Sequence, residues 1–488
     1  MRVLVYSTCL FLFFPFVQVL HAQTSSIRSS LEGQTLLTGQ QVPFWMRSNQ
    51  YGSVPISGAS MSLIGRASKE YSVDSTRRRL FDWGAGFEGR ANLGSGSNFI
   101  PVEAYGKIRL AMFEVKAGRS KDIMGLCDTL LSSGSFAVSG NALGIPKIQL
   151  SIPEFYTLPI LGRWISFKGN WSHGWLGELP TGVNNVSAIT YFHQKSLYGR
   201  FGKPGGSLQF IGGFSHQAFW GNENNIFGNS YTMSNIESYN FVVQGRNWAG
   251  SKVGNHLGSI DVAFEKLINN FKLLVYRQNF YDTGALYYLA NIRDGLNGIS
   301  ITNRGAKTDK LVHWDKVLLE VLATKNQGGQ VWNRFTPSGA ENYYNSYIYE
   351  RGWSYLNTGL GNPLISNQED VKQKYSDLPG GYFINNRVVA IHAGFVGSVK
   401  NWHIITRSTY SWNYGTYSTS GVPYRIPFGR IAEPEESEKF GSVKQFSTNF
   451  SASKELNQNK YCGVDLAVDL GGLFNPTLGL RVKYGVKF

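Results

Sequence analysis

The last eleven residues of the chain, Leu478 to Phe488, alternate between two kinds of side chain. The even-numbered positions hold Leu, Val, Tyr or Phe, and the odd-numbered positions hold Gly, Arg or Lys. Because successive side chains of a strand point to opposite sides of a sheet, the segment predicts a β-strand with one apolar and one cationic face. Such a strand suits a wall between lipid and water. The alternative is an amphipathic strand in a soluble sheet.

The N-terminus predicts export. Arg2 is followed by an apolar run from Leu10 to Val17 and then by a small residue, Ala22, at a suitable cleavage position. This order is typical of a secretory signal peptide, so residues 1–22 are predicted to be removed. Loss of Arg2 changes the net charge from +15 to +14. The remainder has no apolar stretch of about 18 residues, so insertion into a membrane would require a closed barrel.

The same alternation recurs along the chain. The clearest segments are 81–90, 102–112, 113–117, 207–216, 258–266, 271–277, 311–322, 387–396, 401–412, 443–453 and 461–470. Most approach the length of about 9–11 residues that a tilted strand needs to cross a bilayer. Segments rich in Gly, Asn and Ser separate them, and the longest are 221–238 and 333–381. We therefore predict an all-β chain: a transmembrane antiparallel β-barrel from residue 81 to residue 488, with long extracellular loops.

Residues 23–80 are less regular and are predicted to form a short N-terminal periplasmic or lumenal element of uncertain structure. Phe488 resembles the last residue of the C-terminal strand of Gram-negative outer-membrane barrels. That resemblance implies the cell outer membrane as location, contact with outer-membrane lipid, and recognition of Phe488 by the outer-membrane barrel assembly machinery. The mature chain keeps Cys127 and Cys462, and whether they pair is open.

Motifs for catalysis, metals and nucleic acid are absent from the sequence. No nucleophile elbow, zinc-binding pattern or phosphate-binding loop occurs, so we predict no catalytic residue, no metal and no cofactor. Glu433, Glu435, Glu436 and Glu438 form an acidic run that is more typical of a solvated loop than of a cation site. No dense Lys/Arg tract predicts nucleic acid as a partner. The positive charge is instead assigned to loops and to a cationic lumen lined by Arg481, Lys483 and Lys487.

Two aromatic clusters are candidates for binding saccharide. Trp171, His173 and Trp175 alternate with other residues, which predicts that they share one face of a strand. Tyr347, Arg351 and Trp353 lie in a long predicted loop. Aromatic rings stack on sugars, and arginine donates hydrogen bonds to hydroxyl and carboxylate groups. The alternatives are an aromatic girdle facing lipid headgroups for the first cluster and a packed loop for the second.

Several short segments resemble the Wzi family of capsule assembly proteins. They are Pro43 to Gly52, Ile152 to Phe155, Lys168 to Glu178, His193 to Tyr198, Phe214 to Gly221, Asp294 to Gly298 and Trp412 to Gly415. The resemblance extends from about Pro43 to Phe488. It implies a monomeric barrel of about 18 strands, a size known for outer-membrane barrels. It also implies a lectin-like, non-enzymatic role in holding extracellular or capsular polysaccharide at the outer membrane.

These observations predict an outer-membrane barrel that binds surface polysaccharide and supports capsule attachment or assembly. One alternative is a porin-like diffusion channel whose cationic lumen passes anionic solutes or saccharides. A second alternative is a hydrolase built on a barrel, which would require Ser215 with His216 or His173 and an acid to meet in one pocket. Conductance across a planar bilayer distinguishes a channel from a plugged binding protein.

Overall fold

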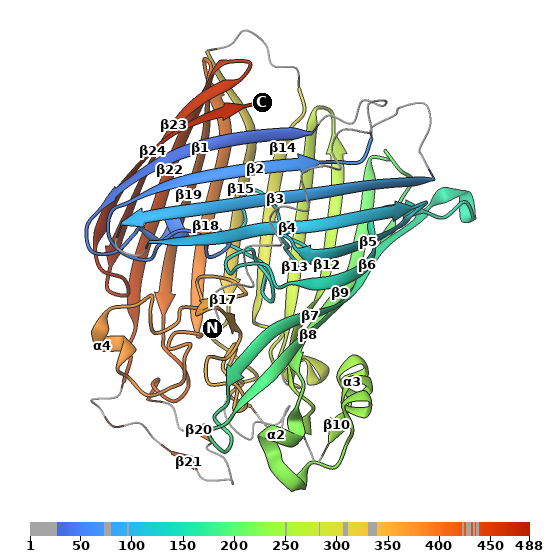
Figure 1. Ribbon diagram of the computed structural model, residues 1–488, viewed down its shortest axis with the longest axis vertical. Helices are drawn as coiled ribbons and strands as arrows, with labels where there is room; N and C mark the ends of the chain where they lie inside the picture. Colours follow the sequence, from blue (N-terminus) through green and yellow to red (C-terminus); the bar gives the residue numbers. More distant parts are fainter. Residues whose placement is uncertain are drawn as a thin grey trace, which may run out of the picture.

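The computed structural model describes residues 27–72, 80–94, 97–248, 251–282, 284–305, 311–329, 339–421, 424–425, 431–432, 435 and 439–488. The predicted signal peptide, the basic run 77–79 and most of the acidic run 433–438 lie outside these residues. In the described part of the chain, no helix is long and apolar enough to cross a membrane. The main body is one closed sheet of 18 antiparallel strands (Figure 1).

The strands of the closed sheet follow the order of the chain. They are β1 (Arg28–Thr38), β2 (Ser60–Lys69), β3 (Phe81–Gly94), β4 (Asn98–Leu110), β5 (Phe113–Arg119), β6 (Lys147–Thr157), β7 (Ile165–Pro180), β8 (Ser187–Phe201), β9 (Leu208–Trp220), β12 (Asn255–Ile268), β13 (Phe271–Tyr281), β14 (Gly295–Asn303), β15 (Val312–Ala323), β18 (Val388–Val399), β19 (Trp402–Asn413), β22 (Val443–Asn457), β23 (Lys460–Gly471) and β24 (Thr477–Lys487). Each strand pairs with the next, and β24 pairs with β1 to close the barrel. The closed 18-stranded antiparallel barrel confirms the predicted fold class.

The remaining elements are short and lie in the connections. They are the helices α1 (Phe44–Arg47), α2 (Glu223–Phe227), α3 (Asn235–Gln244) and α4 (Gln373–Ser376), the 3-10 turns η1 (Leu161–Arg163), η2 (Gly228–Ser230) and η3 (Ala285–Tyr288), and the strand pairs β10 (Asn247–Trp248) with β11 (Ser251–Lys252), β16 (Ser354–Tyr355) with β17 (Thr358–Gly359), and β20 (Tyr424–Arg425) with β21 (Ile431–Ala432).

The two ends of the barrel differ. At the end that carries the C-terminus, the connections are short, for example residues 269–270 between β12 and β13. At the other end they are long, for example residues 324–387 between β15 and β18. We call these the turn end and the loop end; the loop end, with α2, α3 and α4, is at the bottom of Figure 1. In outer-membrane barrels the turns are periplasmic and the loops extracellular.

The barrel begins earlier than residue 81, so the predicted boundary is wrong. β1 and β2 lie within residues 23–80 and both belong to the closed sheet. Their outward positions include small residues, Gly33 opposite Leu63 and Gly65 opposite Leu31, which weakens the apolar alternation. The connection between β1 and β2 includes α1, and it packs against the inner face of the wall: Trp45 Nε1 donates to Thr409 Oγ1 at 3.1 Å.

The wall has the two faces that the last strand predicts. In β24, Leu478, Val482 and Tyr484 are exposed outside, whereas Arg481 is buried in the lumen. Cys462 is the cross-strand partner of Tyr484 and so faces outward, while Cys127 packs inside the barrel. Both cysteines are free. Because they lie on opposite sides of the wall, they do not form a disulfide.

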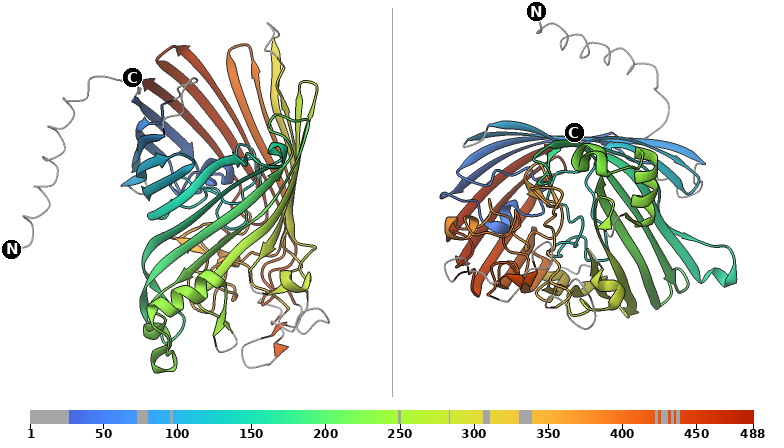
Figure 2. Two further views of the ribbon diagram at one scale, coloured as in Figure 1. Left: turned by 90° about the vertical axis from the view of Figure 1, so that its right-hand side faces the viewer. Right: turned by 90° about the horizontal axis from the view of Figure 1, so that it is seen from below.

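Three connections from the loop end fold into the lumen. Their described residues are 39–59, 120–146 and 339–387, which we call the plug. Figure 2, viewed from below, shows loop segments within the outline of the strands. The three parts contact one another: the N–H of Tyr51 donates to Gly140 O at 2.9 Å, and that of Ser139 donates to Leu360 O at 2.9 Å. The lumen is therefore filled by the chain's own loops on its loop-end side.

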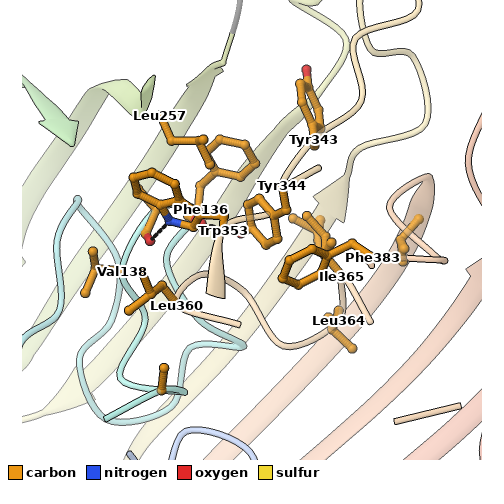
Figure 3. Packing of buried hydrophobic residues seen from close by; sticks show 14 of the residues in the cluster. Phe136, Val138, Leu257, Tyr343, Tyr344, Trp353, Leu360, Leu364, Ile365 and Phe383 are labelled. Atoms are coloured by element: carbon orange, nitrogen blue, oxygen red, sulfur yellow. Dashed lines mark hydrogen bonds between the residues drawn. The ribbon is translucent and has the colours of Figure 1, made fainter. Parts of the chain in front are cut away.

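The plug has an apolar core that is shared with the inner wall. Plug residues such as Phe136, Tyr344 and Trp353 form one buried cluster with the inward-facing wall residue Leu257 (Figure 3). Phe219 of the wall belongs to the same cluster. The rings of Phe136 and Phe280 stack with centroids 4.1 Å apart. Burying several aromatic rings on both sides of this contact makes the plug an extension of the barrel core.

Polar side chains of the inner wall also bind the part of the plug that lies deepest in the lumen. Asp128 accepts hydrogen bonds from Ser300 Oγ at 2.9 Å and Lys316 Nζ at 2.8 Å. Glu320 accepts from the N–H of Ser133 at 2.7 Å. Lys316 is only four residues from the turn-end start of β15, so residues 120–146 reach well down the lumen. These charge-assisted bonds satisfy carboxylates that would otherwise be buried without partners.

Candidate functional site

The first predicted saccharide cluster faces the outside of the barrel. Leu176 packs in the core shared with the plug, so Trp171, His173 and Trp175, on the opposite face of β7, point away from the lumen. Trp171 and Trp175 are 42% and 44% exposed, and His173 is half-buried among other aromatic rings. Their position fits the aromatic girdle that was the alternative interpretation. We do not retain these three residues as saccharide contacts.

The second predicted cluster is split by the structure. Trp353 is 0% exposed, and its indole N–H donates to Ala137 O at 2.8 Å, so its role is packing in the plug. Tyr347 is 61% exposed, and its hydroxyl lies 3.2 Å from Ser251 Oγ. Arg351 is exposed and lines a cleft. Of the six predicted residues, Arg351 is the one that the structure places in this cleft.

The cleft has a volume of about 250 Å³ and lies between the loop-end tip of β7 and the plug. We call it the loop-end cleft. Its principal lining residues are Glu178, Leu179 and Pro180 from β7 and Arg351, Tyr355 and Asn357 from the plug. It therefore combines two charged groups of opposite sign with an aromatic hydroxyl, an amide and apolar surface.

Backbone hydrogen bonds join the two sides of the cleft. The N–H of Gly182 donates to Ile348 O at 3.0 Å, and that of Glu350 donates to Pro180 O at 3.2 Å. Thr181 and Tyr349 form an isolated antiparallel bridge between these bonds. The plug loop thus extends the β7–β8 hairpin as a short additional strand, and this fixes Arg351 beside the tip of β7.

A tight hairpin forms the floor of the cleft. β16 and β17 are joined by Leu356 and Asn357, whose φ angles are +48° and +66°. Two residues with positive φ define a type I′ turn, which matches the twist of paired strands. The hairpin is held from both sides: Tyr382 Oη donates to Asn357 O at 2.6 Å, and Arg119 donates to Tyr355 Oη at 3.1 Å. The cleft floor is therefore preorganised.

The two charged groups of the cleft are available to a ligand. Within the described residues, neither Arg351 nor Glu178 makes an ion pair or a side-chain hydrogen bond. Near Arg351, burial raises the pKa of Glu369, and the positive charge of Arg351 partly opposes that rise. A guanidinium offers five N–H donors in a fixed fork, and a carboxylate offers acceptors. Together they suit sugar hydroxyls and, at Arg351, a sugar carboxylate.

Sequence reasoning missed Glu178, Tyr355 and Asn357. Glu178 ends the aromatic segment that was singled out, but only the strand register shows that it reaches the tip of β7. Tyr355 and Asn357 belong to a two-residue hairpin whose turn, Leu-Asn, lacks the Asn-Gly or Asp-Gly pair that usually signals one.

A second cavity lies inside the lumen at the turn end. Its volume is about 750 Å³, and we call it the vestibule. Arg481, Lys483 and Lys487 line it, as the predicted cationic lumen expects. Asp465 pairs with Arg481 Nε at 2.6 Å and Lys483 Nζ at 3.0 Å, and Glu455 pairs with Lys487 at 2.8 Å. These ion pairs neutralise much of the positive charge that the sequence assigned to the lumen.

No group of three or more histidine, cysteine, aspartate or glutamate side chains in the described part of the chain is arranged to hold a metal ion. A closed barrel with an apolar outer wall, long loops at one end and a lumen filled by those loops defines a plugged outer-membrane barrel protein.

The chain belongs to the Wzi family: the family described as "Capsule assembly protein Wzi" matches residues 19–378. This confirms the family resemblance. Together with the fold it confirms the predicted outer-membrane location and the prediction that the protein is not an enzyme. No curated protein matches the chain.

Solved structures with the same fold include a Wzi from Escherichia coli, an outer-membrane protein involved in group 1 capsule assembly and described as a carbohydrate-binding β-barrel. The TM-score is 0.54 at 13% identity, and the match covers 94% of this chain and 84% of that one. The Acinetobacter baumannii protein OccAB2 gives a TM-score of 0.47 at 10% identity, covering 95% of this chain and 98% of that one. At 13% identity, the likeness to the Escherichia coli protein concerns the fold alone.

Proposed function

We propose that the protein binds surface polysaccharide at the loop-end cleft and thereby supports capsule attachment or assembly. The observation that carries the proposal is that Arg351 and Glu178 have no ion-pair partner among the described residues and lie in a preorganised cleft at the extracellular end of a plugged barrel. Membership of the capsule assembly family supports the process, and the carbohydrate binding described for the Escherichia coli protein supports the ligand class.

The cleft favours one or two sugar units of a longer chain, because about 250 Å³ lies near the lower limit of small-ligand pockets. A polysaccharide repeats the same unit, so many barrels on one cell can hold one chain at once. Weak binding at each site then gives firm attachment through multivalency.

The test uses purified protein and a deletion strain. Purified protein should bind capsular polysaccharide from its own strain, measured by biolayer interferometry with the barrel in nanodiscs. The deletion strain should release capsule into the medium. Capsule that stays fully cell-associated in the deletion strain, together with no binding by the purified protein, would overturn the proposal.

The diffusion-channel alternative predicts steady open conductance in planar bilayers with preference for anions. The vestibule favours that alternative at the turn end, but aromatic residues of the plug fill the other half of the lumen. We expect the wild-type protein to be silent in this assay. Steady open pores would favour the channel.

Assembly and oligomeric state complete the proposal. We propose that the barrel works as a monomer and that the barrel assembly machinery recognises its end at Phe488. Phe488 is exposed beside β1, with its N–H donating to Ser29 O at 2.9 Å, so its ring is accessible for recognition.

A further inference from the structure

A row of residues crosses the outside of the wall from β7 to β13. Trp171, Lys195, His216, Gly258 and Tyr281 are successive cross-strand partners. They share the outward face, because Lys195 pairs with Trp171, which points away from the plug. A lysine and a histidine on this face are unusual, since charged groups facing lipid cost free energy in a depth-dependent way.

The row lies where the outward face of the wall changes from aliphatic and phenylalanine side chains, on the turn-end side, to tryptophan, tyrosine, histidine and lysine. The next outward positions toward the turn end are Leu197, Phe214 and Ile260, which are cross-strand partners and exposed. Apolar side chains continue farther toward the turn end, for example Phe264 on β12. The row therefore marks the level at which lipid tails give way to headgroups on the loop-end side, which is the outer leaflet.

Helix α3 folds back over this row instead of over the barrel mouth, and it is seen beside the strands in Figure 1. A capping box between Ser234 and Glu237 fixes its start. Tyr239 packs against Trp220 at 5.1 Å and against His193 at 5.8 Å between ring centroids. Near the helix end, Lys195 Nζ donates to Val243 O. The end of α3 and the outer face of the wall therefore form the two sides of a cavity.

A cavity of about 310 Å³ lies between the end of α3 and the wall. We call it the outer-wall pocket, and it is lined by Lys195, Phe214, His216, Gln244, Ile260 and Tyr281. His216 is 7% exposed. His256 Nε2 donates to Val253 O at 2.7 Å, so His256 Nδ1 accepts from His216 Nε2 at 2.8 Å. His216 Nδ1 is then an acceptor, and it has no partner among the described residues.

The pocket offers unused polar groups above an apolar floor. Lys195 makes one hydrogen bond within the described chain, so two of its three N–H groups remain for a ligand. His216 Nδ1 is buried and unpaired, which costs free energy unless a ligand satisfies it. Phe214 and Ile260 supply the apolar contact.

We propose that the outer-wall pocket binds the phosphorylated head of an outer-leaflet glycolipid. Lys195 donates to a phosphate oxygen, His216 Nδ1 accepts a hydrogen bond from a hydroxyl group of the lipid head, and Phe214 and Ile260 contact the start of an acyl chain. The pocket is on the lipid side of the wall, where a water-soluble polysaccharide does not reach. An amphiphile with an anionic head is the ligand class that fits both the position and the lining.

The test is a native mass spectrometry titration of the mature full-length protein in detergent micelles. The probes are purified lipid A and enzymatically dephosphorylated lipid A. Wild type should bind lipid A at least about tenfold more tightly than the dephosphorylated form, because a charge-assisted hydrogen bond is lost with the phosphate. Lys195→Met should lose a similar factor, and Lys195→Arg should restore most of it.

Lys266 gives a matched control. It is an exposed lysine on the same outward face of the wall, opposite Leu208, but near the turn end. Lys266→Met should leave binding unchanged, and heat-modifiable migration in gels should show that each variant is folded. Equal binding of the two lipids by wild type, equal effects of Lys195→Met and Lys266→Met, or displacement of lipid A by excess inorganic phosphate would overturn the proposal.

Discussion

The indole ring of Trp353 lies on the ring of Phe219, with centroids 4.2 Å apart and an interplanar angle of 19°. Trp353 comes from the plug and Phe219 from the inner face of β9, so this stack is a direct junction between plug and wall. Both side chains are 0% exposed. A contact of this kind determines whether the lumen is closed.

Trp353→Ala should loosen the plug. Deleting a fully buried tryptophan costs about 3–5 kcal/mol, and its hydrogen bond to Ala137 is lost as well. We expect transient conductance events in planar bilayers where wild type is silent. Tyr347→Ala, an exposed residue of the same loop, is the control and should remain silent. A silent Trp353→Ala barrel would show that other contacts hold the plug.

Attachment of the long loop should strengthen as pH falls. Asp294 accepts hydrogen bonds from the N–H groups of Asn326 and Gln327 and from Tyr343 Oη. Burial raises the pKa of Asp294 to about 6, and the charge of Glu341 adds to the rise. Between this value and the ordinary pKa of 3.8, the folded state binds more protons than the unfolded state, so stability rises as pH falls through 6.

Hydrogen exchange at Asn326 and Gln327 measures this effect. After correction for intrinsic rates, protection at pH 5 should exceed protection at pH 7.5 by about 1 kcal/mol. Asp294→Asn removes the titrating group and should abolish the difference. Protection that is equal at the two pH values in wild type would contradict the prediction.

Asp465 should matter far more to stability than Glu455. Asp465 is 0% exposed and balances both Arg481 and Lys483, so Asp465→Ala leaves two cations without their partner. We expect a loss of about 3 kcal/mol in urea unfolding from detergent. Glu455 makes an exposed pair with Lys487, and Glu455→Ala should cost less than about 1 kcal/mol. Equal losses of unfolding free energy in the two variants would show that water in the vestibule screens both ion pairs to the same extent.

Removal of Phe488 should impair assembly without destabilising the folded barrel. Phe488 contributes an exposed ring and one backbone hydrogen bond to Ser29. The truncated protein should refold in detergent with a midpoint close to that of wild type, yet its amount in the outer membrane should fall severalfold. Normal abundance in cells would contradict a role for Phe488 in recognition.

The strands of the wall were predictable from the sequence because lipid on one side and the lumen on the other make apolar and polar side chains alternate along each strand. Segments with large outward residues, such as Leu478 to Phe488, were identified, whereas β1 and β2 were missed because Gly33 and Gly65 interrupt the outward apolar series. The plug was not predictable, since its contacts join residues far apart in the chain, such as Trp353 and Phe219.

The candidate site was predictable only in part, for the same reason: residue type and alternation can be recognised in the sequence, but contacts between distant segments cannot. Arg351 was identified by its residue type, whereas Glu178 was not, because its place in the cleft depends on the docking of the distant plug loop against β7. The alternation correctly grouped Trp171, His173 and Trp175 on one face. It did not show which face, because aromatic residues suit both a sugar site and a membrane interface.

The most direct test of the central claim measures polysaccharide binding by cleft variants in nanodiscs. Arg351→Gln and Glu178→Gln should each weaken binding about tenfold, because each removes a charge-assisted hydrogen bond. Arg246→Gln, at an exposed arginine of another loop, should bind like wild type. Undiminished binding by both cleft variants, with folding intact, would contradict the account and place the polysaccharide elsewhere on the loop end.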